Sequence, residues 1–445
     1  MATPADALAP VRTKAYVRLL VLAAILGVPI SAIAYWYLKL VALMQAWVFT
    51  DLPKGVGFAA EPVWWPLLPL TVAGLLVGPT IRYLPGRGGQ SPADGFKAGG
   101  VALPAELPGI VLASLISLSL GVVIGPEAPL IAIGGGLAYL AVKLARRDVP
   151  QRTGAVVAAA GSFAAISTLL GSPLAAAFLL MEASGLGGAT ATIVLVPGLL
   201  GAGIGSLIFT GLDSLTGYGT FSLAVPNLPA FAHLDVGQFG WAVAIGVVAP
   251  FACRAIKWLA LAIRPHVEGR LLLTGAVGLL IGGLAAGYAE ITGKPSADVL
   301  FSGQNELGPL LLHSAGYSAG ALVLLILAKG LAYSGALSSF RGGPTFPAMF
   351  IGAAGGMAVS HLPGLPLIAG AAIGMGAMTA GMLRLPLTSV LVTTLFLGHD
   401  GVAAMPLVIV AVVLSYVLVI RLDGPPAAQA PTTAASGEPV PTQVR

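Results

Sequence analysis

The sequence has few charged residues. Only 9% of its 445 residues are Asp, Glu, Lys or Arg, whereas a soluble domain carries about 25%. Because 57% of the residues are hydrophobic, this composition excludes an ordinary soluble protein and predicts an all-α polytopic protein of the plasma (inner) membrane. The net charge of +5 forms no basic patch interleaved with aromatic residues, so we expect no nucleic-acid partner.

Cysteine and enzyme motifs are also scarce. The single cysteine, Cys253, excludes an internal disulfide framework and a multi-cysteine metal site. The five histidines include no i,i+4 pair; they are His233, His266, His313, His361 and His399. One Gly-x-Ser-x-Gly string occurs, Gly-Tyr-Ser-Ala-Gly at 316–320, but it falls inside an apolar membrane segment and not between a strand and a helix, as a nucleophile elbow would. No Walker-type phosphate loop occurs. We therefore expect no enzymatic activity, no metal site and no cofactor.

Glycine and proline, by contrast, are abundant, with 60 and 34 residues. Membrane helices use glycine for close packing, and glycine or proline where a helix is broken. Many apolar segments are shorter than a full membrane span, so the sequence predicts tilted and discontinuous helices. At the N-terminal end, Arg12, Lys14 and Arg18 precede a hydrophobic run too long for a cleavable signal. Their charge predicts a cytoplasmic N-terminus.

Two short motifs recur in the same order. Residues 125–129 read Gly-Pro-Glu-Ala-Pro, and 218 residues later 343–347 read Gly-Pro-Thr-Phe-Pro. Gly-Ser-Pro-Leu at 171–174 is followed, 213 residues later, by Arg-Leu-Pro-Leu at 384–387. Two motif pairs at nearly the same offset indicate two structurally related halves, and broken helices favour an inverted arrangement.

The polar connection between these halves gives the expected division of the chain. The tail after Arg421 is rich in proline and alanine, which is typical of disorder. We predict a disordered lead (1–14), a first membrane half (15–211), a connecting segment (212–236), a second membrane half (237–421) and a disordered tail (422–445).

The acid of the first motif is the strongest candidate for function. A helix that begins inside the membrane leaves its first N–H groups unpaired, and its dipole attracts negative charge. Two such helix starts that face each other would bind an anion through backbone alone. Because proline lacks an N–H, the expected donors are Glu127 and Ala128 in one half, and Thr345 and Phe346 in the other. Gly125 and Gly343 precede them and complete the predicted anion site.

The carboxylate of Glu127 could occupy this anion site itself and leave when it is protonated or displaced. That behaviour would make Glu127 a gate, and an acid inside the membrane is functional by default. The alternative is that Gly-Pro only breaks a helix that Glu127 caps. Glu182 is a second candidate, either as a proton relay that works with Glu127 or as a solvent-facing acid at a helix end.

At these motifs the sequence resembles the CLC family of voltage-gated-type chloride channels and proton-coupled anion antiporters. Residues 125–129 resemble the family's Gly-Arg/Lys-Glu-Gly-Pro element, which implies that Glu127 is the gate. Residues 171–182 resemble its Asn-Ala-Pro-Leu-Ala…Glu-Glu helix, and 342–347 resemble its Gly-x-Phe-x-Pro element. Leu-Pro-Leu-Thr at 385–388 resembles its later Ala-Pro-Leu-Thr segment. The resemblance implies an inverted-repeat helical fold and a homodimer, and we expect a divergent, bacterial-type member without cytoplasmic regulatory domains.

The sequence also departs from the family pattern. Where the family has a serine in Gly-Ser-Gly-Ile-Pro, this chain has Gly89, with Ser91 nearby as a possible substitute. The second glutamate of the Glu-Glu pair, which the resemblance makes the internal proton carrier, is Ala183. Pro344 removes an amide that the family uses, and the family's pore tyrosine has no counterpart. Ala183 favours passive or loosely coupled flux, whereas Gly89, Pro344 and the missing tyrosine favour a protein that keeps the fold but has lost the central anion site.

We therefore expect the protein to pass small inorganic anions, most simply chloride, through a pore gated by Glu127. A proton/anion antiporter for chloride or fluoride is the alternative within transport, with protons and other halides as further partners. A non-transporting membrane scaffold or sensor, with a degenerate anion site, is the alternative of another class.

Overall fold

The computed structural model describes residues 9–96, 101–145, 150–185, 187–219, 225, 228 and 234–424. Within these ranges the chain is helical and contains no strand, only one isolated backbone bridge. Seven of the described helices are long and apolar enough to cross a membrane, and others of 10–17 residues are too short to do so as single spans. The predicted all-α membrane architecture with discontinuous helices is confirmed.

The helices follow the predicted motifs closely. In chain order, they are α2 (Lys14–Ala46), α3 (Leu52–Gly55), α4 (Leu67–Tyr83), α5 (Leu107–Ser119), α6 (Glu127–Ala145), α7 (Gln151–Ala165), α8 (Pro173–Ser184), α9 (Gly188–Thr216), α10 (Val236–Val267), α11 (Leu271–Thr292), α12 (Leu307–Leu312), α13 (Ala319–Ser339), α14 (Thr345–Val359), α15 (Leu367–Leu383), α16 (Pro386–Phe396) and α17 (Gly398–Asp423). Each repeated motif therefore opens a helix: α6 and α14 in one pair, α8 and α16 in the other.

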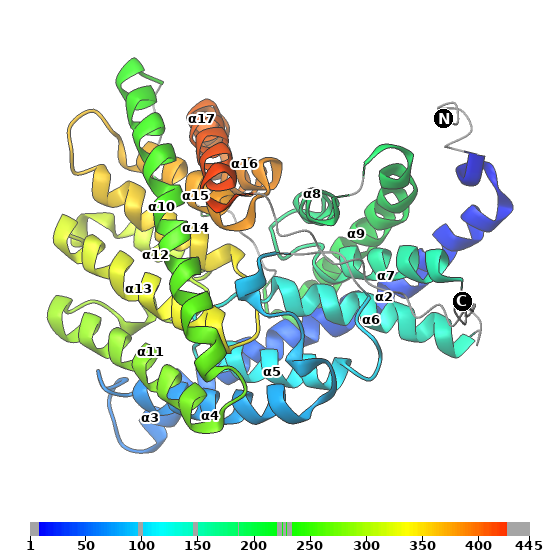
Figure 1. Ribbon diagram of the computed structural model, residues 1–445, viewed down its shortest axis with the longest axis horizontal. Coiled ribbons are helices and arrows are strands. Elements are labelled where there is room, and N and C mark those ends of the chain that lie inside the picture. The colour runs from blue at the N-terminus through cyan, green and yellow to red at the C-terminus, as the bar shows by residue number, and fades with distance from the viewer. Residues whose placement is uncertain are drawn as a thin grey trace, which may run out of the picture.

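The two halves of the sequence lie on opposite sides of the molecule in Figure 1. Helices α2 and α5 to α9 gather on one side, and α10 to α17 gather on the other. Helices α3 and α4 are exceptions, because they lie on the side of α10 to α17, and α4 packs against α11 of the second half. The starts of α6 and α14 meet at the isolated backbone bridge between Gly125 and Gly343.

Glycine lets α4 and α11 approach closely. A Cβ atom at Gly74 would lie 2.2 Å from the Thr274 carbonyl oxygen, and one at Gly278 would lie 2.0 Å from that of Leu70. No larger residue fits at such distances. The two helices run antiparallel, so the end of α4 lies beside the start of α11. The glycine-rich loop after Tyr83 and the Glu268 turn before α11 are thereby brought to the same end of the pair.

Candidate functional site

The starts of α6 and α14 are held side by side by backbone hydrogen bonds. Gly125 N–H donates to Gly343 O at 2.7 Å, and Gly343 N–H donates to Gly125 O at 2.6 Å. This two-bond bridge lies directly before both helices. The repeat of the sequence is thus also a contact in space, because the two copies of Gly-Pro-x-x-Pro touch each other.

The carboxylate of Glu127 extends from the first residue of α6 to the first amide of α14. Its Oε1 accepts a hydrogen bond from Thr345 N–H at 2.6 Å, and the residue is 0% exposed. Its Oε2 has no hydrogen-bond partner among the described residues. A negative oxygen therefore lies where the positive end of the α14 dipole would attract an anion.

The two bridge glycines leave the space that this carboxylate fills. A Cβ atom at Gly343 would lie 2.0 Å from Glu127 Cδ, and one at Gly125 would lie 2.1 Å from Glu127 Oε2. A side chain at either position would collide with the carboxylate. Gly125 and Gly343 thus permit Glu127 to reach the Thr345 amide.

The second helix start is firmly packed around this amide. Thr345 and Phe346 are both buried. On α13, the fully buried Tyr333 donates its hydroxyl hydrogen to Pro344 O at 2.8 Å, directly before Thr345. The sequence reasoning missed Tyr333, because nothing in its local pattern distinguishes it from a core aromatic. Its bond fixes the loop whose next residue holds Glu127.

A cavity of about 300 Å³ adjoins the start of α6. Its lining includes Gly89 from the glycine-rich loop, Ala128 from α6, Glu106 from the N-terminal end of α5, and Arg341. The structure therefore brings two of the predicted anion-site residues, Gly89 and Ala128, to one cavity. Ser91 is buried nearby, and its hydroxyl has no partner among the described residues, but it does not line this cavity.

Glu182 lies near the C-terminal end of α8, and its carboxylate contacts the start of α16. From α8 its carboxylate accepts hydrogen bonds from the N–H groups of Leu387 and Thr388 at 2.9 and 2.8 Å, and from Thr388 Oγ1 at 2.6 Å. It therefore caps α16 of the other half, although it is itself only half-buried. No hydrogen bond joins Glu182 directly to Glu127.

A buried lysine is a further feature that the sequence reasoning missed. Lys329 on α13 is 0% exposed, and its ammonium donates to the carbonyl oxygens of Asp298, Val299 and Leu300 at 2.9, 3.2 and 2.8 Å. Its Nζ also lies 4.3 Å from the centroid of the Phe350 ring. The sequence could have indicated this feature, because Lys329 is the one charged residue in an otherwise uncharged helix and a charge inside a membrane helix needs partners.

Comparisons with known proteins give the family of this chain. Residues 94–419 match the family model described as "Voltage gated chloride channel". Proteins of Salmonella paratyphi A and Salmonella typhimurium that carry the ion-transport name YfeO are 30% identical over 353 residues, which is 77% of this chain and 81% of theirs.

Solved structures show the same fold at low sequence identity. The chain resembles a slow cyanobacterial Cl⁻/H⁺ antiporter with a TM-score of 0.73, at 19% identity, over 92% of this chain and 96% of that one. It also resembles a CLC-type fluoride/proton antiporter with a TM-score of 0.67, at 19% identity, over 90% and 95%. Together with the family match, these similarities confirm the CLC-like fold predicted from the motifs, and this chain belongs to the CLC family of ion-transport proteins.

Proposed function

We propose that this protein passes small inorganic anions, chloride first, across the inner membrane, and that Glu127 is its gate. The observation that carries the proposal is the bond from Thr345 N–H to Glu127 Oε1. A carboxylate on a helix-start amide is in the place of an anion, so the pore is closed while it stays there. Protonation removes the negative charge that holds Glu127 at the Thr345 amide, and an incoming anion competes with the carboxylate for that amide.

Proton coupling is the second candidate for the same site. Glu127 Oε2 is buried without a partner among the described residues, and a buried unpaired carboxylate oxygen costs free energy that a bound proton relieves. A single residue could then exchange a proton and an anion in turn. That both similar solved structures are named as proton antiporters also supports this alternative.

Anion efflux from liposomes tests the transport proposal. Reconstituted protein should release chloride faster than empty liposomes, and a variant at the exposed acid Glu290 (Glu290→Gln) should behave like the wild type. Efflux equal to that of empty liposomes for chloride, bromide and fluoride would instead support the scaffold or sensor alternative. A reversal potential that shifts with the proton gradient would favour the antiporter over the passive pore.

We propose the topology from the charge at the N-terminal end and the assembly from the family relationship. We propose a cytoplasmic N-terminus, because Arg12, Lys14 and Arg18 lie at the start of α2. We also propose a homodimer with one pore in each subunit. Labelling of a cysteine placed at Arg12 in inverted and right-side-out vesicles tests the orientation, and the mass of the detergent-solubilised particle tests the dimer.

A further inference from the structure

The cavity beside α6 has one cationic side chain in its wall. Arg341 lies four residues before the start of α14, and its side chain is only 3% exposed. It shares the cavity lining with Gly89 and Ala128. A buried guanidinium next to the gate has no part in the Glu127–Thr345 contact, so its position needs a separate explanation.

Three of the five guanidinium N–H groups of Arg341 have partners among the described residues. Its Nε donates to Arg87 O at 3.2 Å, its Nη1 to Phe340 O at 3.1 Å, and its Nη2 to Glu268 Oε1 at 2.6 Å. Because arginine carries five donors, two N–H groups are left. The three existing bonds hold the planar group in one orientation, at the wall of the cavity.

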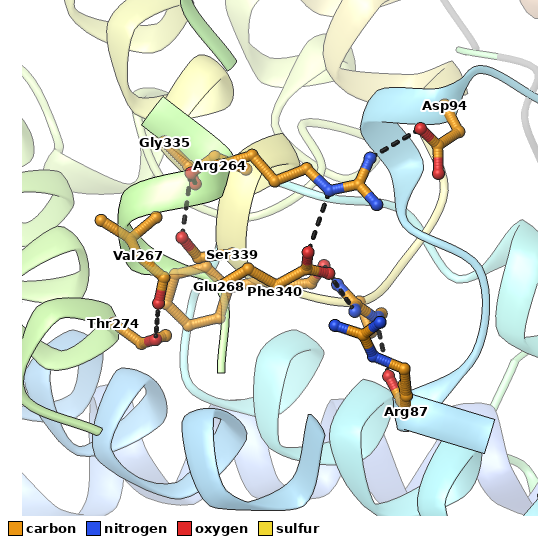
Figure 2. A network of polar contacts seen from close by, with 11 residues as sticks. Arg87, Asp94, Arg264, Val267, Glu268, Thr274, Gly335, Ser339 and Phe340 are labelled. Carbon is orange, nitrogen blue, oxygen red and sulfur yellow. Dashed lines mark hydrogen bonds and ion pairs between the residues drawn. The ribbon is translucent and has the colours of Figure 1, made fainter. Parts of the chain in front are cut away.

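The negative partner of Arg341 is shared with a second arginine. Glu268 Oε2 accepts from Arg264 Nε at 3.0 Å, and Arg264 Nη1 donates to Asp94 at 2.6 Å. Figure 2 shows Arg264 between Asp94 and Glu268, with the Arg87 carbonyl on the far side of Glu268. Asp94 is half exposed, so solvent screens its charge. Glu268 therefore orients Arg341 and only partly neutralises it.

The other charge in the cavity wall is that of Glu106. Its Oε2 already accepts a hydrogen bond from Leu103 N–H at 2.9 Å, at the N-terminal end of α5. Its carboxylate opposes the entry of an anion in general, whereas Arg341 offers donors at one defined point. An anion in this cavity would therefore bind close to Arg341.

We propose that Arg341 is an anion-binding residue of this cavity, and that a halide-sized monovalent anion binds its two remaining N–H groups before it reaches Glu127. This proposal rests on the proposed transport function and adds to it a residue that binds the transported anion. Gly89 in the cavity wall has no side-chain hydroxyl, and Pro344, which lies outside this wall, has no N–H, so the motif positions supply fewer donors to an anion than the family resemblance implies. A charged, weakly hydrated guanidinium compensates for these losses.

Bromide binding tests this site with matched variants. Arg341→Gln removes the positive charge and the forked guanidinium donors and leaves only a shorter neutral amide, while Glu268 keeps its bond to Arg264. Arg264→Gln is the control, because Arg264 contacts the same carboxylate but does not line the cavity. Loss of a charge-assisted hydrogen bond should weaken bromide binding by about tenfold or more in Arg341→Gln. Calorimetry on detergent-solubilised protein should find the control within about threefold of the wild type, since no anion contact is lost.

Location and transport readouts separate this proposal from the function on which it rests. We expect anomalous scattering from bromide beside the guanidinium in the wild type, and Arg341→Lys, which keeps the charge, should bind more tightly than Arg341→Gln. Bromide bound at Arg341 in a protein that transports no anion would support the proposed binding site and overturn the transport proposal. Normal transport with bromide affinity unchanged in Arg341→Gln would overturn the site and leave transport standing.

Discussion

Glu127 and Glu182 both contact the start of a second-half helix, but Glu127 does so from the first residue of α6 and Glu182 from near the C-terminal end of α8. Each acid belongs to the first half, and each accepts a hydrogen bond from the first turn of a second-half helix, α14 or α16. Glu127 is completely buried and uses one oxygen, whereas Glu182 is half-buried and accepts three hydrogen bonds. Two acids of the first half thus make two different contacts with helix starts of the second half.

The difference indicates that an acid bound to a helix start can be either a movable contact or a stabilising one. Glu182 would break three charge-assisted bonds in leaving α16, so we expect it to stay in place. Glu127 would break only one hydrogen bond. Its protonation also removes the unfavourable free energy of a buried carboxylate with one unpaired oxygen. We infer that the α6–α14 pair is the movable contact and the α8–α16 pair the fixed one.

The largest expected effect is at Glu127. Glu127→Ala should leave the Thr345 amide open to anions and make chloride efflux independent of pH. Because one hydrogen bond to a charged group is worth about 1.5–3 kcal/mol, efflux should rise by roughly tenfold or more if release of the carboxylate limits the rate. Liposome flux assays between pH 4.5 and 8 measure both effects. A pH profile identical to that of the wild type would show that Glu127 does not gate.

A buried charge with full hydrogen bonding provides a contrast with Glu127. Lys329→Met would leave three carbonyl groups unpaired around Asp298, Val299 and Leu300. A buried hydrogen-bonding group left without a partner costs about 1–3 kcal/mol, so the thermal midpoint of the detergent-solubilised protein should fall clearly. Lys294→Met, at a half-buried lysine, is the control. A midpoint equal to that of the control would mean that Lys329 is not a structural anchor.

The fixed role of Glu182 predicts a smaller loss of stability. Glu182→Ala removes the cap of α16, and an unpaired helix start costs about 1–2 kcal/mol. The thermal midpoint should drop modestly, while the pH dependence of anion efflux should persist. If Glu182→Ala instead abolished that pH dependence with little change in midpoint, Glu182 would be a proton relay and the comparison with Glu127 would fail.

The smallest effect concerns Glu268, which lies outside the membrane-spanning helices. Burial raises the pKa of Glu268, but hydrogen bonds from Arg341 and Arg264 outweigh burial and hold the pKa below its ordinary value. A lowered folded-state pKa means that these bonds stabilise the fold above the unfolded pKa of about 4.3 and are lost as the pH falls through the folded value. The thermal midpoint of the wild type should therefore exceed that of Glu268→Gln at pH 7 and approach it below about pH 4. A constant difference would contradict this role.

The repeat in the sequence made part of this site predictable. Two copies of Gly-Pro-x-x-Pro indicated two helix starts, and the missing proline N–H groups pointed to the amide of Thr345 as a donor. The resemblance of the motifs to those of the CLC family, which the comparisons confirmed, predicted the fold.

Contacts between unrelated positions could not be predicted in the same way. Arg341 and Glu268 are 73 residues apart, and neither lies in a repeated motif. The cap that Glu182 provides depends on the packing of α8 against α16, which no local pattern encodes. The partners of Lys329 are backbone carbonyls, which every residue possesses, so only the folded loop identifies them.

The position of an anion relative to Thr345 tests the central claim most directly. A high-resolution structure of Glu127→Ala in bromide should contain an anomalous peak within hydrogen-bonding distance of Thr345 N, in the place that the Glu127 carboxylate occupies in the wild type. Such a peak would show that the carboxylate and an anion compete for one site. If no anion were bound at the Thr345 amide at saturating bromide, although the helix starts were unchanged, the proposal that Glu127 occupies an anion site would be contradicted.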